Sequence, residues 1–170
     1  MYNKEIKVAL ILAILSASIY LFSHGEIGYG IVVLLLMGLV LLSIFKDERI
    51  LRAFYYLRKN DMPKAGVVLS KIKHPEKMIK SQEAYYYYLN GLVLSQTQMN
   101  KAEKFFKKAL NIGLRNDTDK AVAKLNLAGL AMSRRRKREA TTLLTEVKKL
   151  DKHNMLEDQV KMMKQQLKKI

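Results

Sequence analysis

Three histidines are the first residues to consider for chemistry, because an imidazole can act as an acid, a base or a metal ligand near neutral pH. His24, His74 and His153 lie far apart in the sequence. No pair has the His-x-x-x-His spacing that places two ligands on one helical face. The chain has no cysteine, which excludes a zinc-thiolate site and a disulfide scaffold. We therefore expect no metal site and no cofactor.

The remaining polar residues show no catalytic pattern. The serines lack a G-x-S-x-G setting, and no glycine-rich phosphate loop is present. Gly25, Gly28 and Gly30 lie instead at the entry of an apolar segment, where small residues serve packing. The carboxylates are scattered singly among lysines, as in solvated ion pairs. The sequence thus predicts no catalytic residues, and we expect a protein that is not an enzyme.

One run of concentrated charge is present. It consists of five consecutive bases: Arg134, Arg135, Arg136, Lys137 and Arg138. Such a run can be a solvated turn, although its like charges repel one another. It can also be a polyanion patch, since each base near an acidic leaflet contributes about 1 kcal/mol and nucleic-acid phosphates attract bases in a similar, salt-dependent way. The sequence leaves a solvated turn, anionic lipid and RNA open.

Charge and hydropathy divide the 170 residues into two unlike parts. Residues 1–46 contain three lysines and two glutamates, which gives a net charge of +1. Because the whole chain carries +16, residues 47–170 carry +15. An apolar, nearly neutral part followed by a polar, strongly basic part excludes a simple soluble globule.

The first part contains two uncharged segments, at about 8–23 and 27–45. At about 1.5 Å per helical residue, the second extends roughly 28 Å, close to the thickness of a bilayer core, and the first roughly 24 Å. The short connection forces an antiparallel arrangement, so we predict a transmembrane helical hairpin. Ala9, Ala13 and Ala17 form a stripe of small residues, as expected where two helices approach closely in lipid.

A cleaved signal peptide and a buried hairpin of a soluble fold are the competing interpretations of this part. A second apolar segment follows the first at once, so we favour the membrane hairpin. Lysines and arginines flank its two outer ends, whereas the connecting loop has none. By the positive-inside rule, we expect an integral protein of a bacterial inner membrane with both termini in the cytoplasm.

The second part has helical periodicity throughout and an internal repeat of 37 or 38 residues. Ala65, Ala102 and Ala140 recur in it, and each is followed four positions later by a large apolar residue. The last two repeats also share Gly91 and Gly129 in similar tripeptides. Regular spacing of this kind is typical of stacked helix pairs.

This pattern resembles the tetratricopeptide (TPR) repeat, a helix-turn-helix in which small residues let two helices approach closely. The resemblance implies an all-α fold in which the hairpin domain, at 1–46, precedes a cytoplasmic α-solenoid domain at 47–170. The expected solenoid has three TPR-like helix pairs and a C-terminal capping helix, at about 47–75, 79–113, 117–152 and 155–170. The apolar stripe of the last segment is interpreted as core packing, in preference to a partner-binding face.

The resemblance further implies a concave groove that binds a protein segment and no small-molecule substrate. By the repeat alignment, the candidate groove residues are Phe54, Leu57, Tyr87, Leu94, Leu125 and Met132. Tyr87 belongs to a run of four tyrosines at 85–88, which spans a full helical turn and cannot lie on one face. Tyrosine combines an apolar ring with a polar tip and is favoured in recognition patches.

We therefore expect a membrane-anchored adaptor or scaffold that mediates protein–protein interaction at the cytoplasmic face of the membrane, in contact with membrane lipids. The anchor would raise the local concentration of the binding unit. The alternative is a basic membrane-tethered module that binds RNA, a ribosome or anionic lipid. A third interpretation is a subunit of a larger membrane assembly in which the hairpin makes the contact.

Overall fold

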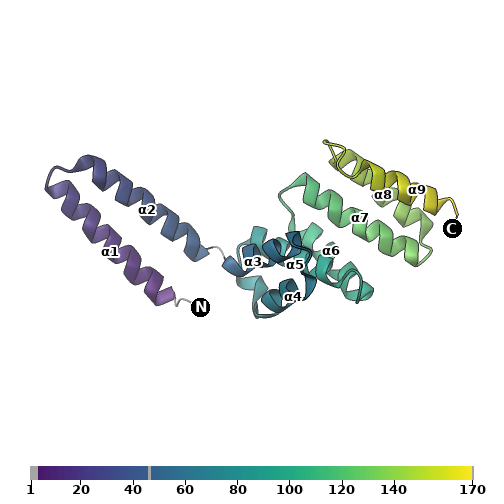
Figure 1. The fold of residues 1–170 in the computed structure, drawn as a ribbon, viewed down its shortest axis with the longest axis horizontal. Coiled ribbons are helices and arrows are strands. Elements are labelled where there is room, and N and C mark those ends of the chain that lie inside the picture. Colours follow the sequence, from purple (N-terminus) through teal and green to yellow (C-terminus); the bar gives the residue numbers. More distant parts are fainter. Residues whose placement is uncertain (1–3, 46, 170) are drawn as a thin grey trace. The chain divides into compact units, whose positions relative to one another are not determined.

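The computed structural model describes residues 4–45 and 47–169, and it describes them as α-helices joined by short turns with no strand (Figure 1). The predicted all-α fold is confirmed. The helices form two compact units, Met1–Glu48 and Arg49–Ile170, which are described separately below.

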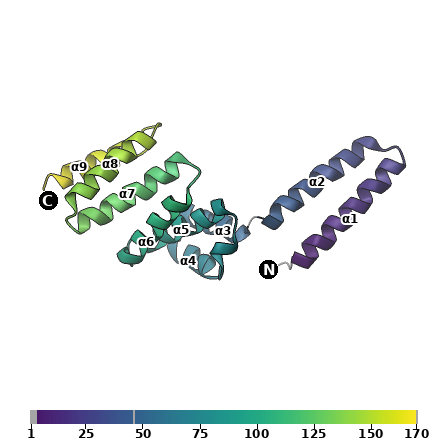
Figure 2. The same cartoon turned by 180° about the vertical axis from the view of Figure 1, so that it is seen from behind.

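The first unit is an antiparallel helical hairpin. Helix α1 covers Lys4–Ser23 and helix α2 covers Ile27–Phe45 (Figures 1 and 2). The turn between them requires the left-handed backbone of Gly25, whose φ is 78°. The amide of Glu26 donates to the carbonyl of Leu21 at 3.0 Å and closes the end of α1.

Small residues form the closest contact within the hairpin. Ser18 and Gly30 are its buried residues among those whose side chains are described, and the Ser18 hydroxyl donates to the Gly30 carbonyl at 3.5 Å. A Cβ on Gly30 would lie only 2.8 Å from the Phe22 ring, so a larger residue cannot fit there without a shift. The predicted alanine stripe at positions 9, 13 and 17 is wrong as a contact surface, because all three alanines are exposed.

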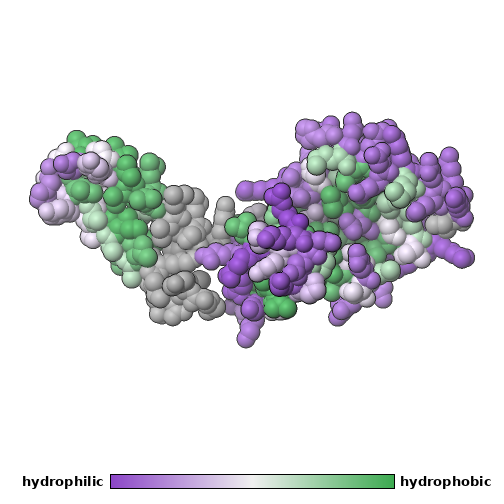
Figure 3. Space-filling view, viewed as in Figure 1, coloured by the Kyte–Doolittle hydropathy of each residue, from purple (hydrophilic) through white to green (hydrophobic). Residues whose placement is uncertain are grey.

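Many large apolar side chains of the hairpin are exposed, and Figure 3 shows part of them as a green surface. The most exposed of them are Leu12, Ile19, Ile27, Leu35 and Tyr29. Within the part of the chain that the structure describes, we find no helix that combines the length and the apolar character needed to span a bilayer. The transmembrane hairpin therefore stays a prediction.

The second unit begins with helices α3 (Glu48–Arg58) and α4 (Met62–Ser70). The Asp61 carboxylate caps α4 by accepting from the Lys64 amide at 3.1 Å, and Pro63 occupies the first turn, where its missing N–H leaves no bond unmade. Ala53 and Leu69 are fully buried in the core that these helices share with the next pair. A short 3-10 turn, η1 (Pro75–Lys77), leads to that pair.

Helices α5 (Lys80–Leu94) and α6 (Met99–Ile112) pack closely against each other. Phe106, a fully buried side chain of α6, lies against the backbone of Gly91 in α5. A Cβ at Gly91 would come within 2.7 Å of the Phe106 ring. Gly113, with a φ of 107°, then ends α6 in a conformation that favours glycine.

Helices α7 (Asp117–Ser133) and α8 (Lys137–Leu150) form the next close pair, and α9 (Glu157–Leu167) packs on both of them. The Asp151 carboxylate accepts from the amides of Met155 and Leu156, at 3.0 and 2.7 Å, and so fixes the turn before α9. This succession of helix pairs and a final helix is compatible with an α-solenoid.

The contrast between Gly91 and Gly129 gives a prediction about stability. Replacing a helical glycine by alanine normally stabilises the helix by about 0.5–1 kcal/mol. At Gly91 the added methyl meets the buried Phe106 ring, and overpacking costs about 1–3 kcal/mol. Gly91→Ala should therefore lower the urea midpoint of the detergent-solubilised chain, followed by circular dichroism.

Gly129→Ala is the matched control for this substitution. Its Cβ would lie 3.6 Å from the terminal methyl of Met163, an ordinary contact, so the gain in helix propensity should persist. Equal shifts of the two midpoints would contradict the close approach at Gly91.

Candidate macromolecular interface

Tyr87, the central candidate of the predicted groove, is buried instead. Only 7% of its surface is exposed, and its ring stacks on Phe105 with centroids 5.8 Å apart. Lys108 also lies over the ring, with Nζ 4.1 Å from the ring centroid, and donates to the Tyr87 hydroxyl at 2.7 Å. The prediction that Tyr87 faces a ligand is wrong, because α6 supplies both an aromatic and a cationic partner within the fold.

Two further groove candidates also belong to a core. Leu125 and Met132 of α7 are buried in the cluster formed by α7, α8 and α9. The reason is that α7 packs against α6, α8 and α9, so it has little free surface. Leu57 and Leu94 are half-buried against the neighbouring core, and Phe54, 39% exposed, is the most accessible of the six.

The tyrosine run instead joins consecutive helix pairs. Tyr85 donates its hydroxyl to the Asp119 carboxylate of α7 at 2.5 Å, and burial together with this bond raises the pKa of Tyr85 to about 12. Its ring meets Tyr88 edge-on at 6.1 Å, and Tyr88 meets Phe106 in the same manner at 6.3 Å. Burial also raises the pKa of Tyr88. The run is therefore mainly structural.

The basic run at 134–138 divides into two groups, of which the first pairs with a carboxylate of the same unit. Arg134 and Arg136 both bind the Glu103 carboxylate of α6, and Arg136 does so at 3.1 Å. Lys107 adds a third bond to Glu103 at 2.8 Å. These contacts join the start of α6 to the turn between α7 and α8 across more than thirty positions of sequence.

Glu103 is the acceptor on which this junction depends. Its side chain is 11% exposed, so an unpaired carboxylate there would be costly. The bond from Lys107 is the largest cause that lowers its pKa, Arg136 adds to it, and burial opposes both; the pKa of Glu103 falls to about 2. Glu103 therefore remains ionised at every physiological pH.

The second group consists of Arg135, Lys137 and Arg138, whose side chains are exposed. Arg135 has a φ of 56°, and the chain reverses at this residue between α7 and α8. Among the described residues these three bases have no ion-pair partner. The predicted polyanion patch is therefore reduced to three of its five members.

Additional exposed lysines extend the positive surface along α6 and α8. They are Lys101 and Lys104 on α6, and Lys148 and Lys149 on α8. The acids of these helices are engaged inside the unit: Glu103 as described, Glu139 with Arg136 at 2.7 Å, and Glu146 with Lys124 of α7. These lysines were not predicted from the sequence, because bases spaced along a helix are a weaker signal than five consecutive bases.

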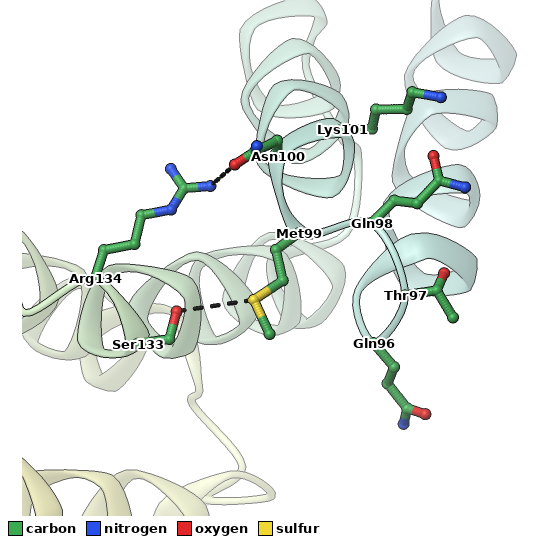
Figure 4. A pocket seen from close by; sticks show the side chains of 8 residues that line it. All are labelled: Gln96, Thr97, Gln98, Met99, Asn100, Lys101, Ser133 and Arg134. Atoms are coloured by element: carbon green, nitrogen blue, oxygen red, sulfur yellow. Dashed lines mark hydrogen bonds between the residues drawn. The ribbon is translucent and has the colours of Figure 1, made fainter.

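A hollow of about 760 Å³ lies where the turn before α6 meets the end of α7 (Figure 4). Its lining residues are Gln96, Thr97, Gln98, Met99, Asn100, Lys101, Ser133 and Arg134. Arg134 donates to the Asn100 amide oxygen on one side of it, and 46% of the Met99 surface is exposed. Amide and hydroxyl groups around one apolar side chain offer both hydrogen bonds and contact area to a polypeptide.

Within the described ranges, no group of three or more His, Asp or Glu side chains is placed to hold a metal ion. Comparison with protein-family models, with curated proteins and with solved structures gives no match. The interpretation of this surface therefore depends on its own geometry and charge.

The Glu103 junction predicts a specific pH dependence. Since the pKa of Glu103 is lowered in the fold, its contribution to stability is present above about pH 4.5 and is lost as the pH falls towards 2. Glu103→Gln should lower the free energy of unfolding by about 1–2 kcal/mol at neutral pH and flatten its decline in acid. Urea titrations between pH 7 and 2.5 measure both effects.

Glu157→Gln serves as the control for the loss of one carboxylate. Glu157 is half exposed and has a single neighbour on its own helix, Lys161, at 2.9 Å. A pair of this kind contributes at most about 0.5 kcal/mol. If both variants lose the same amount, the junction has no special role in stability.

Proposed function

We propose that this chain is a membrane-anchored helical-repeat adaptor. In this proposal residues 1–46 form a transmembrane hairpin in a bacterial inner membrane, with both termini in the cytoplasm. Residues 47–170 form a TPR-like unit that docks a protein partner there, without catalysis. The observation that carries the proposal is the outward placement of the hairpin's large apolar side chains.

The packing of the hairpin supports the anchor. In water, two paired helices place large apolar residues between them and polar residues outside. Here Ser18 and Gly30 are inside, while Leu12 and Leu35 are 62% and 68% exposed. Small residues at the contact and large apolar ones at the periphery are typical of helices packed in lipid.

Docking of a protein is supported by the hollow beside α6. The hollow presents side-chain amides from the turn between α5 and α6, with Met99 as the apolar anchor for a partner residue. A membrane anchor would keep this site at a high local concentration for partners at the same membrane.

The absence of cysteine makes the topology directly testable. His24→Cys, in the exposed hairpin turn, and Asn111→Cys, exposed on α6, each introduce one thiol. In intact spheroplasts, a membrane-impermeant maleimide should label the His24→Cys variant and not the Asn111→Cys variant. Permeabilised cells should show labelling of both.

The reverse labelling pattern would contradict the orientation. Recovery of either variant in the soluble fraction without detergent would contradict the anchor itself. Because both substituted side chains are exposed, the fold should tolerate the changes.

A second candidate function, polyanion binding, is favoured by one specific observation: the acids of α6 and α8 are paired internally while their outer bases are not. Such a surface attracts RNA, ribosomes or anionic lipid through phosphate groups. Affinity of this type falls steeply with salt, because binding releases counterions. The exposed side chains of α6 and α8 include no aromatic ring on which a base could stack, so RNA binding there would be independent of sequence.

Salt and two kinds of substitution separate these candidates. We expect a protein crosslinked to the full chain in native membranes to remain associated when salt is raised from about 50 to 200 mM. The same partner should be lost with Met99→Asp, since a carboxylate there removes the apolar contact that Met99 offers. Crosslinking mass spectrometry of washed membranes measures both.

Polyanion binding would give a different result. Association would collapse over the same salt range and would weaken when Lys104, Lys148 and Lys149 are changed to Gln. The control has the same change in net charge at three bases that already pair with carboxylates: Lys64, Lys120 and Lys161. Equal losses in the two triple variants would indicate a general charge effect and not a defined surface.

A further inference from the structure

The outer face of α3 is unusual for the first helix of a helical repeat unit. Leu51, Phe54 and Tyr55 lie within about one turn of one another, and they are 72%, 39% and 53% exposed. A neighbouring face of the helix is used for packing, since Ile50 and Ala53 are buried in the core. α3 therefore has apolar residues both in the core and on its exposed surface.

A terminal helix in water needs a polar outer face. The last helix, α9, buries Val160 and Leu167, and apart from Met162 its exposed residues are polar or charged. The two ends of the second unit thus differ in the chemistry of their outer surfaces. The first end has an aromatic and aliphatic surface that water alone does not favour.

Basic side chains border this surface. Arg52 and Arg58 are exposed on α3, and Lys59 follows directly, with its Nζ 4.6 Å from the centroid of the Tyr55 ring. A mixture of tyrosine, leucine and long basic side chains is typical of helices that lie in the interface of a bilayer. There the rings reach the acyl boundary while the cations meet lipid phosphates.

The position of α3 in the chain is consistent with this environment. It begins at Glu48, three residues after α2 ends at Phe45. If α2 ends at the cytoplasmic surface of a membrane, so few residues keep the first turn of α3 within about 10 Å of it. A Debye length is of the same size, so the bases of α3 would experience the potential of an anionic leaflet.

We propose that α3 is an interfacial helix whose Leu51, Phe54 and Tyr55 insert among the headgroups of an anionic lipid leaflet, with Arg52, Arg58 and Lys59 bound to lipid phosphates. The inference rests on the proposed membrane anchor. It gives the first helix pair a second role, which is to fix the docking unit at the membrane surface. A protein partner on the same face is the competing occupant.

The chain has no tryptophan, so one substitution provides a clean fluorescent probe of this face. The full chain carrying Tyr55→Trp is reconstituted into vesicles of phosphatidylcholine with or without phosphatidylglycerol, with brominated acyl chains as quenchers. We expect blue-shifted emission and loss of most of its intensity to bromine, with a larger effect in the anionic vesicles. Adding Arg52→Glu and Arg58→Glu should reverse the shift.

Thr142→Trp is the matched control, because Thr142 is exposed on the outer face of α8 between the basic ends of that helix. Its emission should resemble that of tryptophan in water and should escape quenching. Equal quenching of both probes would overturn the assignment to α3, since the whole unit would then lie on the lipid. A blue shift at Tyr55→Trp without bromine quenching would overturn it in favour of a protein contact.

Flotation of the vesicles separates this inference from the proposed function. A chain that does not float with the vesicles refutes the anchor. A chain that floats while the Tyr55→Trp probe remains water-exposed refutes the interfacial helix and leaves the anchor intact.

Discussion

The outward apolar side chains of the hairpin are the constraint on which the rest of the organisation depends. α1 and α2 bury only a narrow contact stripe in each other, so Leu12 and Leu35 require another apolar environment. The α5/α6 pair shows the opposite distribution, with Phe106 inside and Lys104 outside. In the same chain, therefore, one helix pair exposes its large apolar side chains and another buries them. This contrast is the physical argument for assigning different surroundings to the two units.

Internal pairing of acids decides where positive charge remains available in the second unit. Its fold uses Glu103 to join two helix pairs, Asp119 to hold Tyr85, and Asp151 to fix the turn before α9. Each of these carboxylates is engaged within the fold, so exposed bases that bind none of them, such as Lys101 and Lys104, keep their charge available. The excess of lysine and arginine in the sequence therefore remains at the surface of the unit as uncompensated positive charge. The same internal bonds of these carboxylates thus stabilise the unit and leave its surface positively charged.

The sequence was sufficient to predict the all-α fold, because a period of three to four residues persists through its second part. It was insufficient for the burial of Tyr87 and Leu125, since helices in the middle of a stack pack on several neighbours and periodicity does not show which. It also could not show that Arg134 and Arg136 are paired within the fold, because their acceptor, Glu103, lies 31 and 33 positions earlier. Local patterns identify helices and charge runs, whereas the pairing of distant residues decides which of them remain accessible.

The first and last helices of the second unit, α3 and α9, differ in the chemistry of their exposed surfaces. A stack of helix pairs always leaves one uncovered face at each end, and the chemistry of that face indicates its surroundings. The lysines and glutamines of α9 are suited to water, whereas Leu51 and Tyr55 of α3 are suited to an interface between water and an apolar phase. The end with the apolar surface is also the end joined to the apolar hairpin. α2 has no charged residue, whereas α3 exposes both apolar and basic side chains, as expected if the chain leads from lipid into an interface with water.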